Sequence, residues 1–166
     1  MPVVKNFSQS ENIAVCMYGD ASKMSEVTKE YLKSCKYDYF IHSTTEVDLT
    51  DLNPKSSKVE SKTDDVLKNN IYSLSQVVSM KESHEQEINK IYDHVICFNA
   101  SCDFVLPAIV KDNCFHIENN IMYCDSMNMD VLNTLYSKLK YYKKQNYTEQ
   151  DVILWHLKKF NIELST

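Results

Sequence analysis

The feature that most constrains the fold is a short, continuous apolar run at residues 13–18, which stops abruptly at Gly19 and Asp20. An apolar run of this length without polar alternation is typical of a strand that is buried on both faces, as in a parallel sheet. Gly19 is the only glycine in the chain. Its position directly after the strand indicates either a tight turn with positive φ or a close backbone approach to a ligand, and the sequence leaves both open.

Further strands are predicted at residues 37–43 and 93–98, each ending in polar residues. Residues 115–118 and 121–124 flank Asn119 and Asn120, a pattern typical of a hairpin with an asparagine-rich turn. Residues 44–69 are rich in Ser, Thr, Asp and Lys and show little periodicity, which predicts a long polar loop with one short helix at 63–68.

Helical periodicity separates these strands. A first helix is expected from Ser22 as its cap, and further helices at 70–90, 129–142 and from Thr148, where acidic residues follow in the first turn. The residues expected on the buried faces of the first two helices are Met24, Val27, Tyr31, Leu32 and Cys35, then Ile71, Leu74, Val78, Ile88 and Ile91. The order of elements predicts one α/β domain over residues 1–166, an α/β/α sandwich whose sheet is mixed because of the hairpin.

Composition excludes several classes of protein. The net charge of −5 argues against a broad nucleic-acid surface, although Lys138, Lys140, Lys143 and Lys144 cluster near one helix end, where a solvated face is expected. The chain has no arginine, so no bidentate guanidinium can hold a phosphate. No apolar stretch approaches the roughly 20 residues of a membrane span, and no secretory pattern or CxxC pair occurs, which predicts a cytoplasmic protein with free thiols.

Ligands of open α/β sheets bind beyond the carboxyl ends of the strands. Residues 18–20, 42–44 and 99–103 are expected to meet at that edge, and the loop at 44–69 emerges there and could act as a lid. Acidic and amide side chains suit a hard divalent ion such as Mg²⁺ or Mn²⁺. No glycine-rich phosphate-binding motif is present. The acidic Asp103 beside a buried strand end is the leading candidate, because a carboxylate in such a place needs partners.

Several segments occur in the order of a known family: IAVCMYG, YDYFIHSTTE, IYSLSQVVSMKESHE, YDHVICFNASCDF, MDVLNTLYSKL and TEQDVILWHL. Together they span nearly the whole chain and resemble the small GT-A-like glycosyltransferases of bacteria, phages and large viruses. The resemblance implies a GT-A-like fold, a nucleotide-diphosphate sugar donor such as a UDP-sugar, and transfer of the sugar to an acceptor hydroxyl. Any further partner, including a second copy of the chain, is left open.

The chain departs from the family pattern at the acidic motif that follows the third strand. There the family places a DxD-like pair that holds Mn²⁺ or Mg²⁺ against the diphosphate, whereas this chain has Asn99, Ala100 and Ser101, with Asp103 two residues later. Asp103 is therefore the expected metal ligand. The family's usual arginines near the first turn and this strand are also absent, replaced by Asp20 or Ala21 and by Cys97 and Asn99.

The resemblance also assigns expected roles to individual residues. The donor-binding residues are expected to be Met17, Tyr18, Gly19, Asp20, His42, Thr44, Tyr72, Ser73, Gln76, Asn99, Ser101 and Asp103. Asp125 or Glu149 is expected to act as the general base toward the acceptor, or to contact sugar hydroxyls. The acceptor itself is expected at the 44–69 loop, at the C-terminal helices or at a partner subunit.

Two other readings stay open. A degenerate transferase-like module would bind a nucleotide, a glycan or a protein without turnover, and the eroded acidic motif favours it. A Rossmann-like or flavodoxin-like nucleotide-binding regulator fits the order of elements but lacks every phosphate fingerprint.

Overall fold

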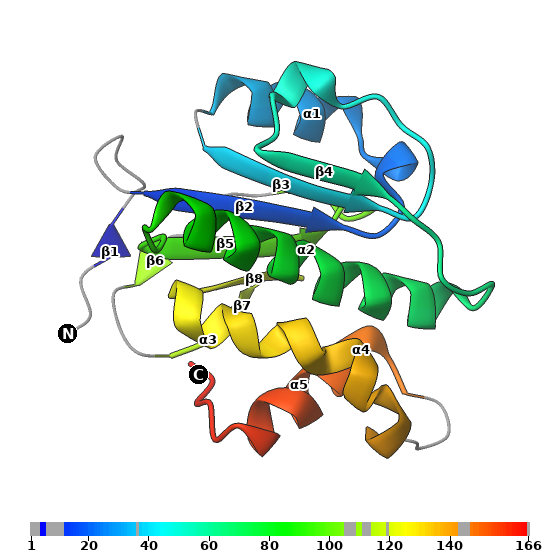
Figure 1. The fold of residues 1–166 in the computed structure, drawn as a ribbon, viewed down its shortest axis with the longest axis vertical. Coiled ribbons are helices and arrows are strands. Elements are labelled where there is room, and N and C mark those ends of the chain that lie inside the picture. Colours follow the sequence, from blue (N-terminus) through cyan, green and yellow to red (C-terminus); the bar gives the residue numbers. More distant parts are fainter. Residues whose placement is uncertain are drawn as a thin grey trace.

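The computed structural model describes residues 4–5, 12–35, 37–104, 109–110, 114–118, 120–142 and 147–165. Its centre is a six-stranded sheet in the order β4-β3-β2-β5-β8-β7 (Figure 1). The strands are β2 Ile13–Tyr18, β3 Asp38–Ser43, β4 Ser56–Val59, β5 His94–Asn99, β7 His116–Glu118 and β8 Ile121–Cys124. A separate antiparallel pair joins β1 Val4–Lys5 to β6 Ile109–Val110.

The sheet is mixed, as the hairpin predicted. Strands β4, β3, β2 and β5 run parallel, whereas β8 is antiparallel to both β5 and β7. Asn120, in the turn between β7 and β8, has a φ of 64°, a left-handed conformation that asparagine tolerates well. Because β8 runs backwards, its end lies beside the start of β5: Cys124 pairs with Val95. Segments that follow β8 therefore leave from the opposite edge to those that follow β2, β3 and β5.

Side chains of β2 alternate between two cores because the sheet is covered on both faces. Ala14, Cys16 and Tyr18 face one cluster, and Val15 and Met17 face the other. The first cluster is packed by α2 and the helices that follow β8, the second by α1 and the short 3₁₀ turns η1 Ala21–Lys23 and η2 Thr50–Leu52 (Figure 1). The α/β/α sandwich is thus confirmed.

The helices that pack against the sheet are α1 Glu26–Ser34, α2 Val66–Ile88, α3 Ser126–Asp130, α4 Leu135–Lys138 and α5 Glu149–Lys159. The 3₁₀ turns η3 Val131–Thr134 and η4 Leu139–Tyr142 join α3, α4 and the following chain. The helix predicted at 129–142 is therefore a chain of short helical segments, with Met129, Leu132, Leu135, Leu139 and Tyr142 all buried as expected. At α5, Thr148 caps the helix and forms a capping box with Asp151.

The first helix differs from the prediction. Its cap is Ser25, whose side chain accepts from the Thr28 N–H, whereas Ser22 lies in the preceding 3₁₀ turn. The buried face of α1 carries Thr28 and Leu32, so Val27 is 81% exposed and Tyr31 38% exposed. Ile88 and Ile91, expected to face inward, are also exposed because α2 ends at Ile88, with Asn89 in a left-handed conformation.

The prediction of a long loop at residues 44–69 is also wrong in part. The segment contains η2 and the edge strand β4, and α2 already begins at Val66. Strand β4 has the sequence SSKV and is largely exposed, so it carries no apolar alternation that could reveal it. Its pairing is with β3, and two backbone bonds, Lys55 N to Tyr39 O and Glu60 N to Ser43 O, hold its ends.

Among the helices of the described residues, none is long and apolar enough to cross a membrane.

Candidate functional site

A polar cleft of about 340 Å³ lies at the carboxyl edge of the parallel strands. It is bounded by the turn after β2, the end of β3, the segment between β4 and α2, the first turn of α2 and the end of β5. The residues that line it are Asp20, Lys23, Thr44, Thr45, Ser61, Thr63, Asp64, Val66, Asn69, Asn70, Asn99 and Ser101. Four of the predicted donor-binding residues therefore meet in one place: Asp20, Thr44, Asn99 and Ser101.

Gly19 is required by the packing of this edge. Its φ is +90°, a conformation that side chains rarely adopt, and an added Cβ would lie 2.7 Å from Oδ1 of Asn99. The same Oδ1 accepts from the N–H and the hydroxyl of Ser101, at 3.0 and 2.8 Å. The positive-φ turn considered from sequence is therefore present, whereas the approach to a ligand stays a prediction. The close approach is to the Asn99 side chain, which this arrangement fixes in the cleft wall.

Asp20 presents a fixed carboxylate on the other side of the cleft. Its Oδ1 accepts hydrogen bonds from Ser22 and from the Thr45 hydroxyl. Partial burial opposes ionisation, but these hydrogen bonds outweigh it, and the pKa of Asp20 lies below its ordinary value. Asp20 is thus ionised at neutral pH and ties the turn after β2 to the turn after β3.

His42, Ser73 and Tyr72 form a buried support behind the cleft rather than part of its wall. His42 is fully buried, with Nδ1 2.7 Å from Oγ of Ser73 and Nε2 3.3 Å from Oε1 of Glu60. The Gly19 N–H donates to the same Ser73 oxygen at 2.9 Å. Tyr72 donates to Oε1 of Glu60 at 2.6 Å. Burial lowers the pKa of His42, so the ring is neutral at pH 7 and positions Gly19 and Glu60.

Glu149 lies at the first turn of α5, against the residues that end β2 and β5. Polar interactions with Tyr18 and Asn99 favour its ionised form, yet burial outweighs them and raises the pKa of Glu149. Its Oε1 is buried and has no hydrogen-bond partner among the residues that the structure describes. A buried carboxylate oxygen without a donor costs free energy, and such groups gather where a ligand or a proton is handled.

The other predicted residues lie apart from the cleft wall. Met17 and Tyr18 are buried in the two cores, on opposite faces of β2, and Gln76 lies on α2, half-buried. Asp103 is exposed and does not line the cleft, because the chain after Ser101 turns toward α1, where the Phe104 N–H donates to Thr28.

Asp125 lies at the opposite edge of the sheet, since it follows the reversed strand β8. Its carboxylate there accepts from the Asn128 amide at 2.7 Å. The structure thus separates the two candidate bases: Glu149 lies at the cleft edge and Asp125 does not. The sequence prediction overlooked the reversal, which a hairpin between β7 and β8 implies.

The segment between β4 and α2 supplies cleft residues that sequence reasoning did not name, among them Ser61, Thr63, Asp64 and Asn69. Asn69 organises them: its Oδ1 accepts from the Lys62 N–H at 2.9 Å and its Nδ2 donates to Ser61 at 3.0 Å. The only signal was the expectation that the polar segment at 44–69 emerges at this edge, which gives the location but not the residues.

Whether a divalent cation fits can be judged from the oxygens of the cleft. Within the described part of the chain, no group of three His, Cys, Asp or Glu side chains is placed to hold a metal ion. The cleft nevertheless has two carboxylates, Asp20 and Asp64, among hydroxyl and amide oxygens. Mg²⁺ commonly binds through one or two carboxylates together with substrate phosphates and water. The oxygens of the cleft are thus of the kind that Mg²⁺ takes as ligands, although fewer than three carboxylates line it among the described residues.

Comparisons with known proteins bear on the fold. No protein-family model matches this sequence, and no curated protein matches it. A solved structure described as a glycosyltransferase involved in the glycosylation of the major capsid of PBCV-1 is similar in three dimensions, with a TM-score of 0.50 and 8% identity. The match covers 86% of this chain and 74% of that one. At this identity the likeness concerns the fold, and it shows that this chain has a glycosyltransferase-like α/β fold.

Proposed function

We propose that this chain is a glycosyltransferase of the GT-A type, which binds a nucleotide-diphosphate sugar such as a UDP-sugar in the cleft. The observation that carries the proposal is the position of Glu149. This buried carboxyl group, with one oxygen unpartnered among the described residues, lies directly against Asn99, which lines a polar cleft at the carboxyl edge of the sheet. Ligands of open α/β sheets bind beyond the carboxyl ends of the strands, and the fold similarity to a glycosyltransferase supports a nucleotide-sugar ligand there.

The donor would be held by several kinds of group. Thr44 and Thr45 follow β3 and offer hydroxyls to the nucleoside, while Lys23 brings an ammonium group to the cleft. Since Asp20 and Asp64 are carboxylates, Lys23 alone cannot neutralise a diphosphate. A bound Mg²⁺ or Mn²⁺, held by Asp20 or Asp64 together with the phosphates, would supply the missing positive charge and stabilise the leaving group.

Glu149 is proposed as the base for the acceptor. Its raised pKa brings it closer to neutrality than an ordinary glutamate, as proton transfer requires, and its free Oε1 can accept a hydrogen bond from an acceptor hydroxyl. The proton would pass from that hydroxyl to Oε1 while the oxygen bonds to the sugar carbon and the nucleoside diphosphate leaves.

The proposal is tested by thermal unfolding with a panel of UDP-sugars, in Mn²⁺ and in EDTA, followed by assay of UDP release. A bound donor raises the unfolding midpoint, and at 100 times Kd the gain is about 2.7 kcal/mol. Lys23→Gln is expected to reduce the shift, whereas Lys90→Gln, an exposed lysine far from the cleft, should leave it unchanged. No shift with any nucleotide sugar would contradict the proposal.

The same thermal unfolding experiment tests which carboxylate binds the cation. Asp64→Asn is expected to reduce the Mn²⁺-dependent part of the shift, whereas Asp103→Asn should not, since Asp103 lies outside the cleft. A loss of the Mn²⁺-dependent shift in Asp103→Asn but not in Asp64→Asn would indicate that Asp103, the ligand expected from sequence, binds the cation. Binding without UDP release would favour the degenerate, non-catalytic module, for which the exposed position of Asp103 is the supporting observation.

A further inference from the structure

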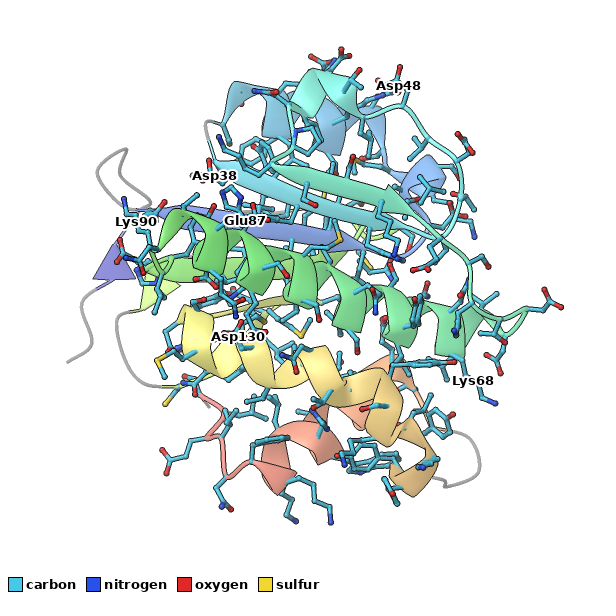
Figure 2. The ribbon with its side chains drawn as sticks, viewed as in Figure 1. Asp38, Asp48, Lys68, Glu87, Lys90 and Asp130 are labelled. Atoms are coloured by element: carbon cyan, nitrogen blue, oxygen red, sulfur yellow. The ribbon has the colours of Figure 1, made fainter. Side chains whose placement is uncertain are left out.

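A second hollow lies close to Glu149, on the side of α2 away from the donor cleft. Its volume is about 360 Å³, and it is lined by Lys68, Tyr136, Ser137, Leu139, Lys140 and Tyr147. We call it the tyrosine pocket. Lys68 projects from the first turn of α2 on the side of α4 (Figure 2), whereas Val66, Asn69 and Asn70 of that turn line the donor cleft. The two hollows therefore share one helical turn as their dividing wall.

The chain links the tyrosine pocket to the proposed base. Tyr147 lines the pocket, and Glu149 follows two residues later, so their Cα atoms lie within at most about 7 Å of each other. Tyr147 is held by its ring contact with Trp155, at 6.2 Å between centroids. A molecule that fills this pocket would thus lie against the chain two residues before Glu149.

The chemistry of the pocket is aromatic and cationic. Tyr136 stacks edge-on with Tyr72, at 5.0 Å, so its ring is held in place. Rigid tyrosine rings offer flat apolar faces, on which the C–H faces of sugar rings pack, together with hydroxyls for hydrogen bonding. Of the described residues that line the pocket, two are lysines and none is a carboxylate, although the chain as a whole has a net charge of −5.

Neither pocket lysine has an ionic partner among the described residues. Across the part of the chain that the structure describes, neither Lys68 nor Lys140 forms a salt bridge; the ammonium of Lys140 lies 5.1 Å from the Tyr141 ring centroid. Lys138 lies over the same ring, at 5.5 Å. The lysine cluster of the C-terminal half, expected from sequence to be a solvated face, thus contributes Lys140 to a concave, aromatic site.

We infer that the tyrosine pocket is the acceptor subsite and that it takes a saccharide carrying a negative charge, such as a uronic acid. The acceptor role of the pocket rests on the proposed function. The sugar ring would pack against Tyr136 and Tyr147, its anionic group would meet Lys68 and Lys140, and its hydroxyl would reach toward Glu149. The shared wall of α2 would keep donor and acceptor apart except at the Asn99 and Glu149 end.

The test compares two probes that differ by one carboxylate, 4-nitrophenyl β-glucuronide and 4-nitrophenyl β-glucoside. Their Kd values are measured by ligand-observed NMR for the unmodified protein and for a Lys68→Gln/Lys140→Gln double variant. The glucuronide is expected to bind about fivefold more tightly than the glucoside, because two exposed charge contacts contribute modestly. The double variant should abolish this preference, and Lys159→Gln, an exposed lysine on α5, should preserve it.

A further variant separates stacking from charge. Tyr147→Leu keeps an apolar side chain but removes the ring, so it should weaken both probes equally and leave their ratio unchanged. Equal binding of the two probes to the unmodified protein, a preference that survives the double variant, or no binding of either probe would overturn the inference.

UDP binding in the same samples keeps this inference distinct from the proposed function. UDP that binds while neither probe does would leave the donor site standing and remove the tyrosine pocket as a subsite. A glucuronide preference that depends on the two lysines, in a protein that binds no UDP, would establish the pocket and contradict the proposed function.

Discussion

Glu85 and Glu149 are carboxylates buried on the same face of the sheet, at opposite edges, and their surroundings differ. Glu85 is 6% exposed, and each of its oxygens has a donor: Lys81 at 2.7 Å, Ser126 at 2.6 Å and the Tyr92 N–H at 2.9 Å. Burial opposes its ionisation, but these partners outweigh it and lower the pKa of Glu85. For Glu149 burial prevails and raises the pKa.

The difference separates a structural site from a functional one. The ammonium of Lys81 is fully buried and also bonds Ser126 and Asp130, so it joins α2 to α3. In that cluster Glu85 and Asp130 share the Lys81 ammonium, and each of the three groups has a hydrogen-bond partner. At the other edge, Oε1 of Glu149 has no partner in the described residues, beside a cleft and a pocket that each have room for a small molecule.

The largest expected effect comes from breaking the satisfied cluster. Lys81→Met would leave Glu85 and Asp130 without their counter-charge, and loss of one partner of a buried ion pair costs about 3–5 kcal/mol. Urea unfolding should show this decrease in stability. Lys90→Met, at an exposed lysine near the end of α2, should change stability by less than about 0.5 kcal/mol. Equal effects of the two substitutions would remove the structural role of the cluster.

The Glu149→Gln substitution tests the proposed role of Glu149 as the base. The substitution keeps the shape of the side chain but removes its ability to accept a proton, so UDP release from the active donor should fall about 100-fold. The Kd for UDP should stay within about twofold, as expected for a group that does not hold the nucleotide. Glu87→Gln, at an exposed glutamate on α2, should leave both values unchanged. A Glu149→Gln variant with full activity would show that another group takes the proton.

The Gly19→Ala substitution tests whether donor binding depends on the position of Asn99 in the cleft wall. The positive φ alone costs a residue with a side chain about 1–2 kcal/mol, and the new Cβ would displace Asn99. Both stability and UDP affinity should therefore fall. Asn53→Ala, at another positive-φ position, should lower stability without changing UDP affinity, since Asn53 does not line the cleft. Unchanged UDP affinity in Gly19→Ala would show that the position of Asn99 does not matter for the donor.

The smallest expected effect is the dependence of stability on pH. Because the folded pKa of Glu149 is raised, the stability associated with its neutral form is present below the unfolded pKa and is lost as pH rises through the folded value. Glu149→Gln should therefore unfold a few degrees above the unmodified protein at about pH 8 and at the same temperature at about pH 4. Thermal scans at both pH values measure the difference. A variant that is less stable at about pH 8 would contradict a raised pKa.

The sequence predicted the fold better than the site. Apolar runs place β2, β3 and β5 correctly, and the Asn119–Asn120 turn predicts the hairpin, since both signals are local. Strand β4 was missed because an exposed edge strand has no apolar pattern. The polar residues predicted at the strand ends meet as expected where they follow parallel strands.

The positions of the candidate site residues depend on tertiary packing, so local sequence patterns could not predict them. Asp125 lies away from the cleft because its location depends on the direction of β8, and Asp103 does so because the chain turns toward α1 after Ser101. Their proposed roles stay predictions. His42 was expected at the nucleotide, but its burial beneath Ser73 and Glu60 follows from how α2 packs on β3. Only the structure shows that Glu149, predicted from its place at a helix start, lies against Asn99.

The most direct test of the contrast is a ¹³C NMR titration of the glutamate carboxyl carbons, with Glu149→Gln and Glu85→Gln used for assignment. The account predicts that Glu85 titrates below the ordinary glutamate value and Glu149 above it. Addition of the UDP-sugar that gives the largest thermal shift should move the pKa of Glu149 and leave that of Glu85 in place. Similar pKa values for the two residues, or a Glu149 pKa that does not respond to the donor, would contradict it.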